Sequence, residues 1–167
     1  MDEAGFQLLP SVVRTYAPRG ETPLLREEAT RAHLSVISGV TPEGRLFTQL
    51  QETTIKGTEG VRFLRHLERQ LGGRLLVVWD GAAIHRSQPV REFLTTEAGS
   101  GIELAALPSY APDCNPDEDV WGWAKRDLAN HSLPDLAALR PELRATLRRM
   151  QQRPALIQSF FAHAGYG

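Results

Sequence analysis

The sequence predicts an α/β fold in which helices flank a mixed central sheet. Two short apolar runs, Leu75–Trp79 and Ile102–Leu107, have the length of buried strands, and helical spacing of apolar residues surrounds them. A third observation is the segment His33–Leu50, which has strand-like content on both sides of the turn sequence Thr41–Gly44. A hairpin pairs its strands antiparallel and helical crossovers pair them parallel, so the sheet should be mixed.

The first part of the chain should contribute strands and a loop. Phe6–Leu9 resembles the end of a strand closed by Pro10. The stretch Val12–Arg31 is rich in arginine, proline and glycine and is expected to be a loop, with at most a short strand. His33–Val40 and Leu46–Leu50 then form the expected hairpin.

The apolar spacing changes to a helical period after the hairpin. Apolar residues recur at spacings of three, three and four, which places them on one face of a helix: Val61, Leu64, Leu67 and Leu71. Gly72 and Gly73 should end this helix. The next strand, Leu75–Trp79, is continuously apolar and is expected to be covered on both faces.

Helices should dominate the rest of the chain. One is expected from about Gln88 to Thr96, before the second buried strand, and another begins at Asn115. In the C-terminal third, one helical face carries Leu143, Leu147 and Met150.

Composition predicts one soluble domain spanning residues 1–167. Hydrophobic residues make up 41% and charged residues 23% of the 167 residues. The strongly apolar runs are too short to span a membrane, and the start of the chain has no pattern of a secretory signal. Cys114 is the single cysteine, which excludes an internal disulfide and a cysteine-based zinc site. A reducing, cytoplasmic setting is the simplest interpretation.

Charge is balanced overall but unevenly distributed. The net charge of −1 argues against a strongly cationic DNA-binding module. The interval between Arg91 and Lys125 has no basic residue and seven acidic ones, whereas the interval from Arg140 to Arg153 carries five arginines and a single glutamate. An acidic part and a basic part therefore follow one another along the chain.

Asp80 is the first candidate functional residue. It follows the strand Leu75–Trp79 directly, at the carboxyl end where α/β sheets bind ligands, and a small-residue loop, Gly81–His85, comes next. A structural interpretation stands beside this one, because aspartate often caps a turn.

Glu118 and Asp2 also have two interpretations each. Asn115 to Glu118 has the pattern of a helix start with a capping box, which explains Glu118 without chemistry. That pattern does not explain why Asp113, Asp117 and Asp119 crowd the same helix entry, which a bound divalent cation would explain. Asp2 is by default a disordered terminal acid, although the apolar residues that follow it suggest order.

Three motifs give the chain a family resemblance. They are Asp2–Phe6 with Thr15–Gly20, then Trp79–Ser87, then the long and specific block Leu107–Trp121. The sequence resembles the DDE superfamily endonucleases, the transposases of mariner-like bacterial insertion sequences, through Lys125 and on to Ser159–Phe161.

The resemblance implies a ribonuclease H-like fold and a catalytic triad of carboxylates. It assigns the two catalytic aspartates to Asp2 and Asp80 and the catalytic glutamate to Glu118, which would also be the ligands of Mg²⁺, with Mn²⁺ as a substitute. Three carboxylates from separate elements can hold two such ions. DNA is the implied substrate, both as transposon ends and as target, and a homodimer is the implied assembly. The N-terminal helix-turn-helix region of the family is not found in residues 1–167, and only Met1 precedes Asp2.

Several further residues are accessory candidates. His85 would orient a phosphate or the nucleophile, and Lys125, two turns after Glu118, would contact phosphate; a structural histidine and a solvated lysine are the alternatives. Asp117 competes with Glu118 as a ligand, because it occupies a place that is usually apolar in the family. A further set, Arg144, Arg148 and Arg149, would track a DNA backbone or form a solvated helix face.

Three functions remain in competition. The first is a transposase catalytic domain that cuts transposon ends and joins them to target DNA. The second is a hydrolytic nuclease of the same fold. The third is an inactive transposase remnant that only binds DNA or a partner.

Overall fold

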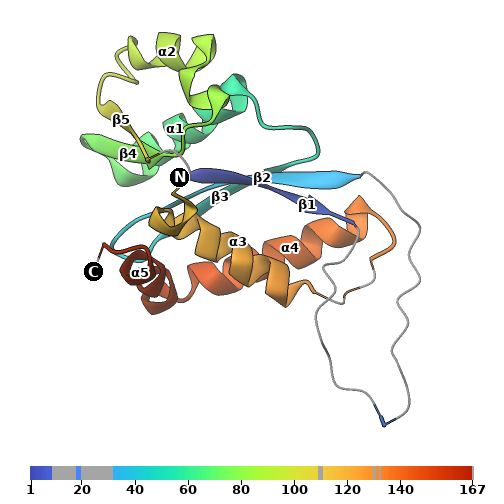
Figure 1. The fold of residues 1–167 in the computed structure, drawn as a ribbon. Helices are drawn as coiled ribbons and strands as arrows, with labels where there is room; N and C mark the ends of the chain where they lie inside the picture. The colour runs from blue at the N-terminus through green and yellow to red at the C-terminus, as the bar shows by residue number, and fades with distance from the viewer. Residues whose placement is uncertain (9–17, 20–31, 109–110, 130, 132, 167) are drawn as a thin grey trace.

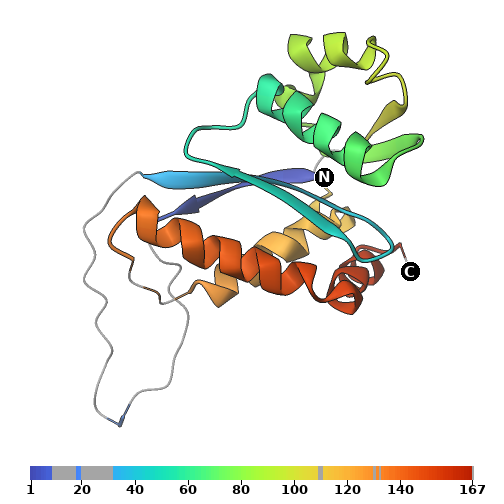
Figure 2. The same cartoon turned by 180° about the vertical axis from the view of Figure 1, so that it is seen from behind.

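A layer of helices lies on each side of a small antiparallel sheet in the computed structural model (Figure 1). The structure describes residues 1–8, 18–19, 32–108, 111–129, 131 and 133–166. Helices α3 and α4 cover one face of the sheet, and α1 and α2 lie on the other side with strands β4 and β5. The same layers are seen from behind in Figure 2. The predicted loop Val12–Arg31 lies almost entirely outside the described residues.

Strands β1, β2 and β3 form the antiparallel part of the fold. β1 (Asp2–Gln7) pairs with β2 (His33–Val40), and β2 pairs with β3 (Leu46–Gln51). The predicted hairpin is therefore confirmed. Its turn closes through the Gly44 amide, which donates to the carbonyl of Thr41 at 2.9 Å, and Gly44 adopts a φ of 88° that favours glycine.

Strands β4 (Leu75–Trp79) and β5 (Ile102–Ala106) form a separate parallel pair. The expectation of antiparallel pairing at the hairpin and parallel pairing across the helical crossovers is confirmed, although the backbone ladders form two sheets among the described residues. Met1, the residue before β1, links them, because its amine donates to the carbonyl of Val78 at 2.9 Å.

The expectation that Leu75–Trp79 is covered on both faces was wrong. Val77 and Trp79 are buried against the α1 side, but Leu76 is 64% exposed and Val78 is 37% exposed. Their face of β4 borders a cavity of about 490 Å³ that reaches Phe161 and Tyr166 instead of a packed helix. A continuous apolar run does not distinguish a strand buried on two faces from one that faces a cavity.

Helices α1 and α2 cover the buried face of β4. α1 (Gly57–Leu71) ends at Gly72, as its sequence predicted, and buries Leu64 and Leu67. A 3₁₀ turn, η1 (Ala83–Arg86), leads into α2 (Gln88–Leu94), which is two residues shorter than predicted.

Besides the hydrophobic cluster between β4 and α1, a second hydrophobic core lies between the antiparallel sheet and the last three helices. These are α3 (Pro116–Asp127), α4 (Leu136–Gln151) and α5 (Pro154–His163), and a 3₁₀ turn, η2 (Pro112–Cys114), precedes them. The predicted face of α4 is confirmed, since Leu143, Leu147 and Met150 are at most 2% exposed. The helices of the described residues are all too short or too polar to cross a membrane.

Candidate functional site

The carboxylates of interest gather where β1 begins and β4 ends. Asp80 follows the last residue of β4, and its side chain remains 41% exposed. Its Oδ1 accepts a hydrogen bond from the Ala82 amide at 3.2 Å, so the turn-capping interpretation is correct. It does not exclude function, because the same carboxylate borders a cavity of about 200 Å³ that Gly81 and Ala82 also line.

Asp2 is ordered and buried, against the default expectation for a terminal acid. Pairing with Ser38 in the antiparallel ladder fixes its backbone. Its Oδ2 accepts hydrogen bonds from Asn115 Nδ2 at 2.9 Å and from Trp121 Nε1 at 3.0 Å, and its Oδ1 accepts from the Glu3 amide at 2.7 Å. Helix α3 therefore holds this carboxylate in one orientation beneath the sheet.

Burial raises the pKa of Asp2 to about 7, because the charged form is separated from water. The negative charge of Asp117 raises this pKa further, and that of Asp80 makes a smaller contribution in the same direction. Hydrogen bonds from the Glu3 amide and from Trp121 oppose the shift. Three carboxylates are therefore close enough to interact, and a bound cation would relieve the repulsion between them.

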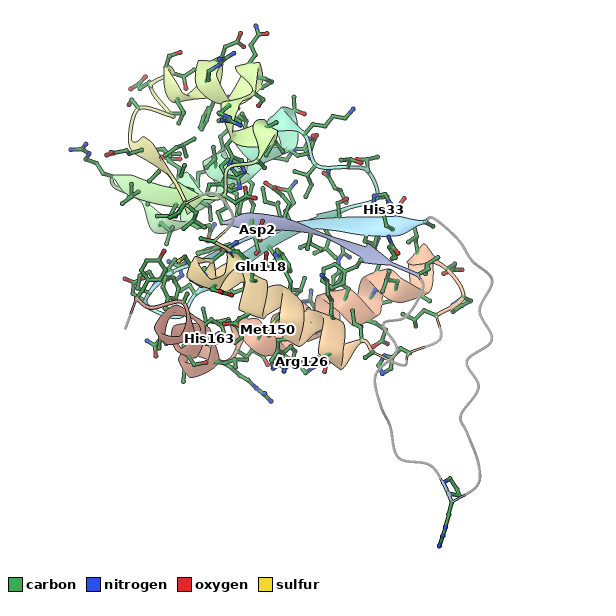
Figure 3. All side chains as sticks on the ribbon, in the orientation of Figure 1. Asp2, His33, Glu118, Arg126, Met150 and His163 are labelled. Carbon is green, nitrogen blue, oxygen red and sulfur yellow. The ribbon has the colours of Figure 1, made fainter. Side chains whose placement is uncertain are left out.

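Glu118 is exposed on the first turn of α3, between Asn115 and Trp121, which both donate to Asp2 (Figure 3). Asn115 is the N-cap, as predicted, and its side chain accepts from the Asp117 amide. The predicted capping box does not form: the Asn115 amide donates to Pro112 in the preceding turn, so Glu118 has no capping donor to accept from. The described residues give the Glu118 side chain no hydrogen bond or ion pair, and its convergence with Asp2 and Asp80 stays a prediction.

Asp117 points inward from the same turn. It is fully buried, accepts a hydrogen bond from Ser38 Oγ and forms an ion pair with the Met1 amine at 3.0 Å. Its charge acts on Asp2 more strongly than that of Asp80 does. Asp117 is thus closer to the buried part of the site than its sequence neighbour Glu118.

The sequence did not indicate Glu3, which joins Asp80 on the other side of β1. Because adjacent residues of a strand face opposite sides, Asp2 points to α3 and Glu3 points to the end of β4. Glu3 Oε1 accepts from Trp79 Nε1 at 3.1 Å and lies 3.8 Å from His85 Nε2. The strand alternation around Asp2 was the only available signal for this role.

The accessory candidates fall into two groups. His85 meets Asp80, with 3.1 Å between Nε2 and Oδ1. The remaining candidates lie on helix surfaces and form no part of this cluster: Lys125, Arg144, Arg148 and Arg149 are exposed on α3 and α4, and Arg149 pairs with Asp127.

The carboxylate oxygens and the imidazole nitrogen gathered here are atoms that can bind a divalent cation. Oxygen ligands are what Mg²⁺ prefers, and the ligand atoms of Glu3, Asp80 and His85 lie within 4.8 Å of one another. Buried Asp2 and Asp117 add negative charge beside them.

The fold is shared with known transposases of the mariner type. The Mos1 strand transfer complex matches with a TM-score of 0.64 and 19% sequence identity over 98% of this chain and 53% of the Mos1 chain. The catalytic domain of Mos1 mariner transposase matches with a TM-score of 0.56 and 18% identity over 82% of this chain and 76% of that chain. The mariner Mos1 paired end complex with Mg is also similar, with a TM-score of 0.64 and 19% identity over 98% of this chain and 54% of that chain.

These similarities confirm the ribonuclease H-like fold. The chain spans about half the length of the Mos1 chains in the complexes. No curated protein was found to match the sequence.

The family follows from a match in sequence. The model of the DDE superfamily endonuclease family matches residues 1–140, which include Asp2, Asp80 and Glu118. This match covers most of the chain and agrees with the fold. The chain therefore belongs to the DDE superfamily endonucleases.

Proposed function

We propose that this chain is the catalytic domain of a DNA transposase, which cleaves phosphodiester bonds at transposon ends and joins those ends to target DNA. The observation that carries the proposal is the electrostatic contact of Asp2 with Asp80 and Asp117, from three elements distant in sequence, within a member of the DDE endonuclease family. Burial and neighbouring negative charge that raise the pKa of one carboxyl, here Asp2, are typical of functional sites.

The proposed residues divide the work by their exposure. Asp80 and Glu118 are open to solvent and would meet the DNA, whereas Asp2 is held from below by Asn115 and Trp121. Asp2, Asp80 and Glu118 would hold two Mg²⁺ or Mn²⁺ ions. When bound, these ions would stabilise the negative charge that develops at the reacting phosphate. In cleavage a water oxygen bonds to phosphorus and the 3′ oxygen leaves as a 3′-hydroxyl. In joining, that 3′-hydroxyl oxygen bonds to a phosphorus of the target DNA, and the 3′ oxygen of the target leaves.

The chain's own electrostatics agree with a requirement for a cation. DNA phosphates would be repelled by the exposed carboxylates of Asp80 and Glu118, and by Asp2 in its charged form, until a cation neutralises them. DNA as partner, and a homodimer as the assembly, belong to the same proposal. The Mos1 structures named above are a strand transfer complex and a paired end complex.

The test is nicking of supercoiled plasmid DNA in Mg²⁺ or Mn²⁺ by residues 1–167 and by variants. Asp80→Asn and Glu118→Gln should each lose ~100-fold in rate, equivalent to about 3 kcal/mol of transition-state stabilisation. Glu97→Gln is the control, because Glu97 is an exposed acid outside the site. Equal nicking by Asp80→Asn and the unchanged chain would refute the proposal.

A second assay separates transposase from nuclease. Oligonucleotide duplexes with a free 3′-hydroxyl, made from the DNA that flanks the coding region, are incubated with plasmid and cation. Joined products support strand transfer, whereas nicking without joined products indicates a hydrolytic nuclease.

A further inference from the structure

Three side chains meet on the side of β1 opposite to Asp2. His85 Nε2 lies 3.1 Å from Asp80 Oδ1 and 3.8 Å from Glu3 Oε1, and these residues come from η1, the end of β4 and β1. We propose that Glu3, Asp80 and His85 form a divalent transition-metal site in which the imidazole of His85 supplies a nitrogen ligand.

The separations match those between ligands of one cation. Two ligand atoms that are each about 2.1 Å from a metal stand about 3.0 Å apart at a right angle and about 3.6 Å apart at 120°. The observed separations of 3.1 and 3.8 Å are near these values, and all three ligand atoms lie within 4.8 Å of one another. Binding therefore requires only small side-chain movements.

His85 gives independent evidence for a ligand. Its side chain is only 9% exposed, and it stacks on Trp79 with ring centroids 3.6 Å apart. Despite this burial, neither ring nitrogen has a partner in hydrogen-bonding geometry among the described residues. Buried polar atoms are normally hydrogen-bonded, yet Nε2 makes no hydrogen bond although Asp80 Oδ1 lies 3.1 Å away. A cation between the three groups would give Nε2 a partner.

The carboxylates are oriented in the way that metal ligands usually are. The Trp79 indole donates to Glu3 Oε1 at 3.1 Å, and the Ala82 amide donates to Asp80 Oδ1 at 3.2 Å. The described lysine and arginine residues form no ion pair with either carboxylate. Asp80 and His85 also line the 200 Å³ cavity, which gives a cation and its waters access from solvent.

The nitrogen ligand determines the class of cation. Imidazole suits the later transition metals, whereas an all-oxygen site suits Mg²⁺. The site should bind Zn²⁺, Co²⁺ and Mn²⁺ more tightly than Mg²⁺. Because it shares Asp80 with the proposed catalytic centre, the inference deepens the proposed function and rests on it for its biological role.

The test uses Mn²⁺ alone, without DNA, bound to residues 1–167. Pulsed electron paramagnetic resonance should detect nitrogen coupling to bound Mn²⁺. The coupling should disappear in His85→Gln and persist in His66→Gln, a half-buried histidine on α1 outside the cluster. Titration calorimetry should show Mn²⁺ affinity at least ~10-fold weaker in Glu3→Gln and His85→Gln.

Bound Mn²⁺ without nitrogen coupling in the unchanged chain would overturn the inference, whether or not His85→Gln folds. Equal Mn²⁺ affinity in folded Glu3→Gln and the unchanged chain would also overturn it. The plasmid assay separates this result from the proposed function: nitrogen coupling without nicking supports the site and opposes the function. Asp80-dependent nicking in Mg²⁺ without nitrogen coupling to Mn²⁺ would support the proposed function and oppose the metal site.

Discussion

At the scale of single residues, the first two acids of the chain have different environments because β1 is a strand. Asp2 faces α3 and receives two side-chain hydrogen bonds, while Glu3 faces Trp79 and His85. Removing the charge of Asp2 should therefore affect Asn115 and Trp121, whereas removing the charge of Glu3 should affect Trp79 and His85.

Asp2 should make stability depend on pH. Its pKa is raised from 3.8 to about 7, so the folded state holds its proton more tightly than the unfolded state does. This contribution is fully present below about pH 4 and is lost as pH rises through about 7, with a magnitude on the order of 4 kcal/mol. In Asp2→Asn the loss of unfolding free energy between pH 4 and 8 should shrink, as urea unfolding without metal measures. An equally steep loss in this variant would contradict the assignment.

At the scale of elements, the entry of α3 shows how local geometry frees a functional group. The Asn115 amide donates to the carbonyl of Pro112 in the 3₁₀ turn η2, so Asn115 caps α3 through its side chain and its carbonyl, without a capping box. Glu118 consequently has no capping role and stays exposed, while Asn115 Nδ2 reaches Asp2. One short turn thus connects the start of α3 to the site.

The β2–β3 turn offers a test of how closely elements pack. Gly44 has a φ of 88°, and a Cβ there would lie 2.5 Å from the carbonyl oxygen of Pro154 at the start of α5. Gly44→Ala should lower the unfolding free energy by about 1–3 kcal/mol, because it combines backbone strain with a clash. Chemical denaturation measures this change.

Gly122→Ala is the matched control, since a Cβ at Gly122 in α3 would meet no atom within 4 Å. Alanine should stabilise that helix by about 0.5–1 kcal/mol. Changes of the same sign in both variants would contradict the packing argument.

At the scale of the whole molecule, basic and acidic surfaces are carried by different parts of the fold. Arg144 and Arg148 are exposed on α4, one turn apart, and neither has an ion pair in the described part of the chain. The arginines beside them on α4 are partly neutralised, because Arg140 pairs with Glu52 and Arg149 pairs with Asp127. The guanidinium groups of Arg144 and Arg148 are therefore available to bind the phosphates of a DNA backbone under the proposed function.

The double variant Arg144→Gln/Arg148→Gln tests this surface. If each arginine contacts one phosphate, the slope of log binding constant against log salt should fall in magnitude by about 1.8. Fluorescence anisotropy with duplex DNA measures it. Arg62→Gln/Arg69→Gln is charge-matched and lies on α1, on the other side of the sheet (Figure 1), so its slope should not change. Equal effects of the two double variants would show that only net charge matters.

Most of the fold was predictable from the sequence because its elements are encoded locally. The hairpin, α1 with its glycine end, the buried face of α4 and the N-cap Asn115 all follow from spacing and turn chemistry. The family motifs further indicated Asp2, Asp80 and Glu118, and the match to the DDE family supports the motifs.

The tertiary structure alone decided which residues share an environment. Only strand register and helix packing place Asp2 among Asn115, Trp121 and the charge of Asp117, and only the loop after β4 brings His85 to Asp80 and Glu3. The exposed face of β4 and the raised pKa of Asp2 were equally hidden. Periodicity reports which side of its own element a residue occupies, whereas burial and electrostatics depend on what another element places opposite it.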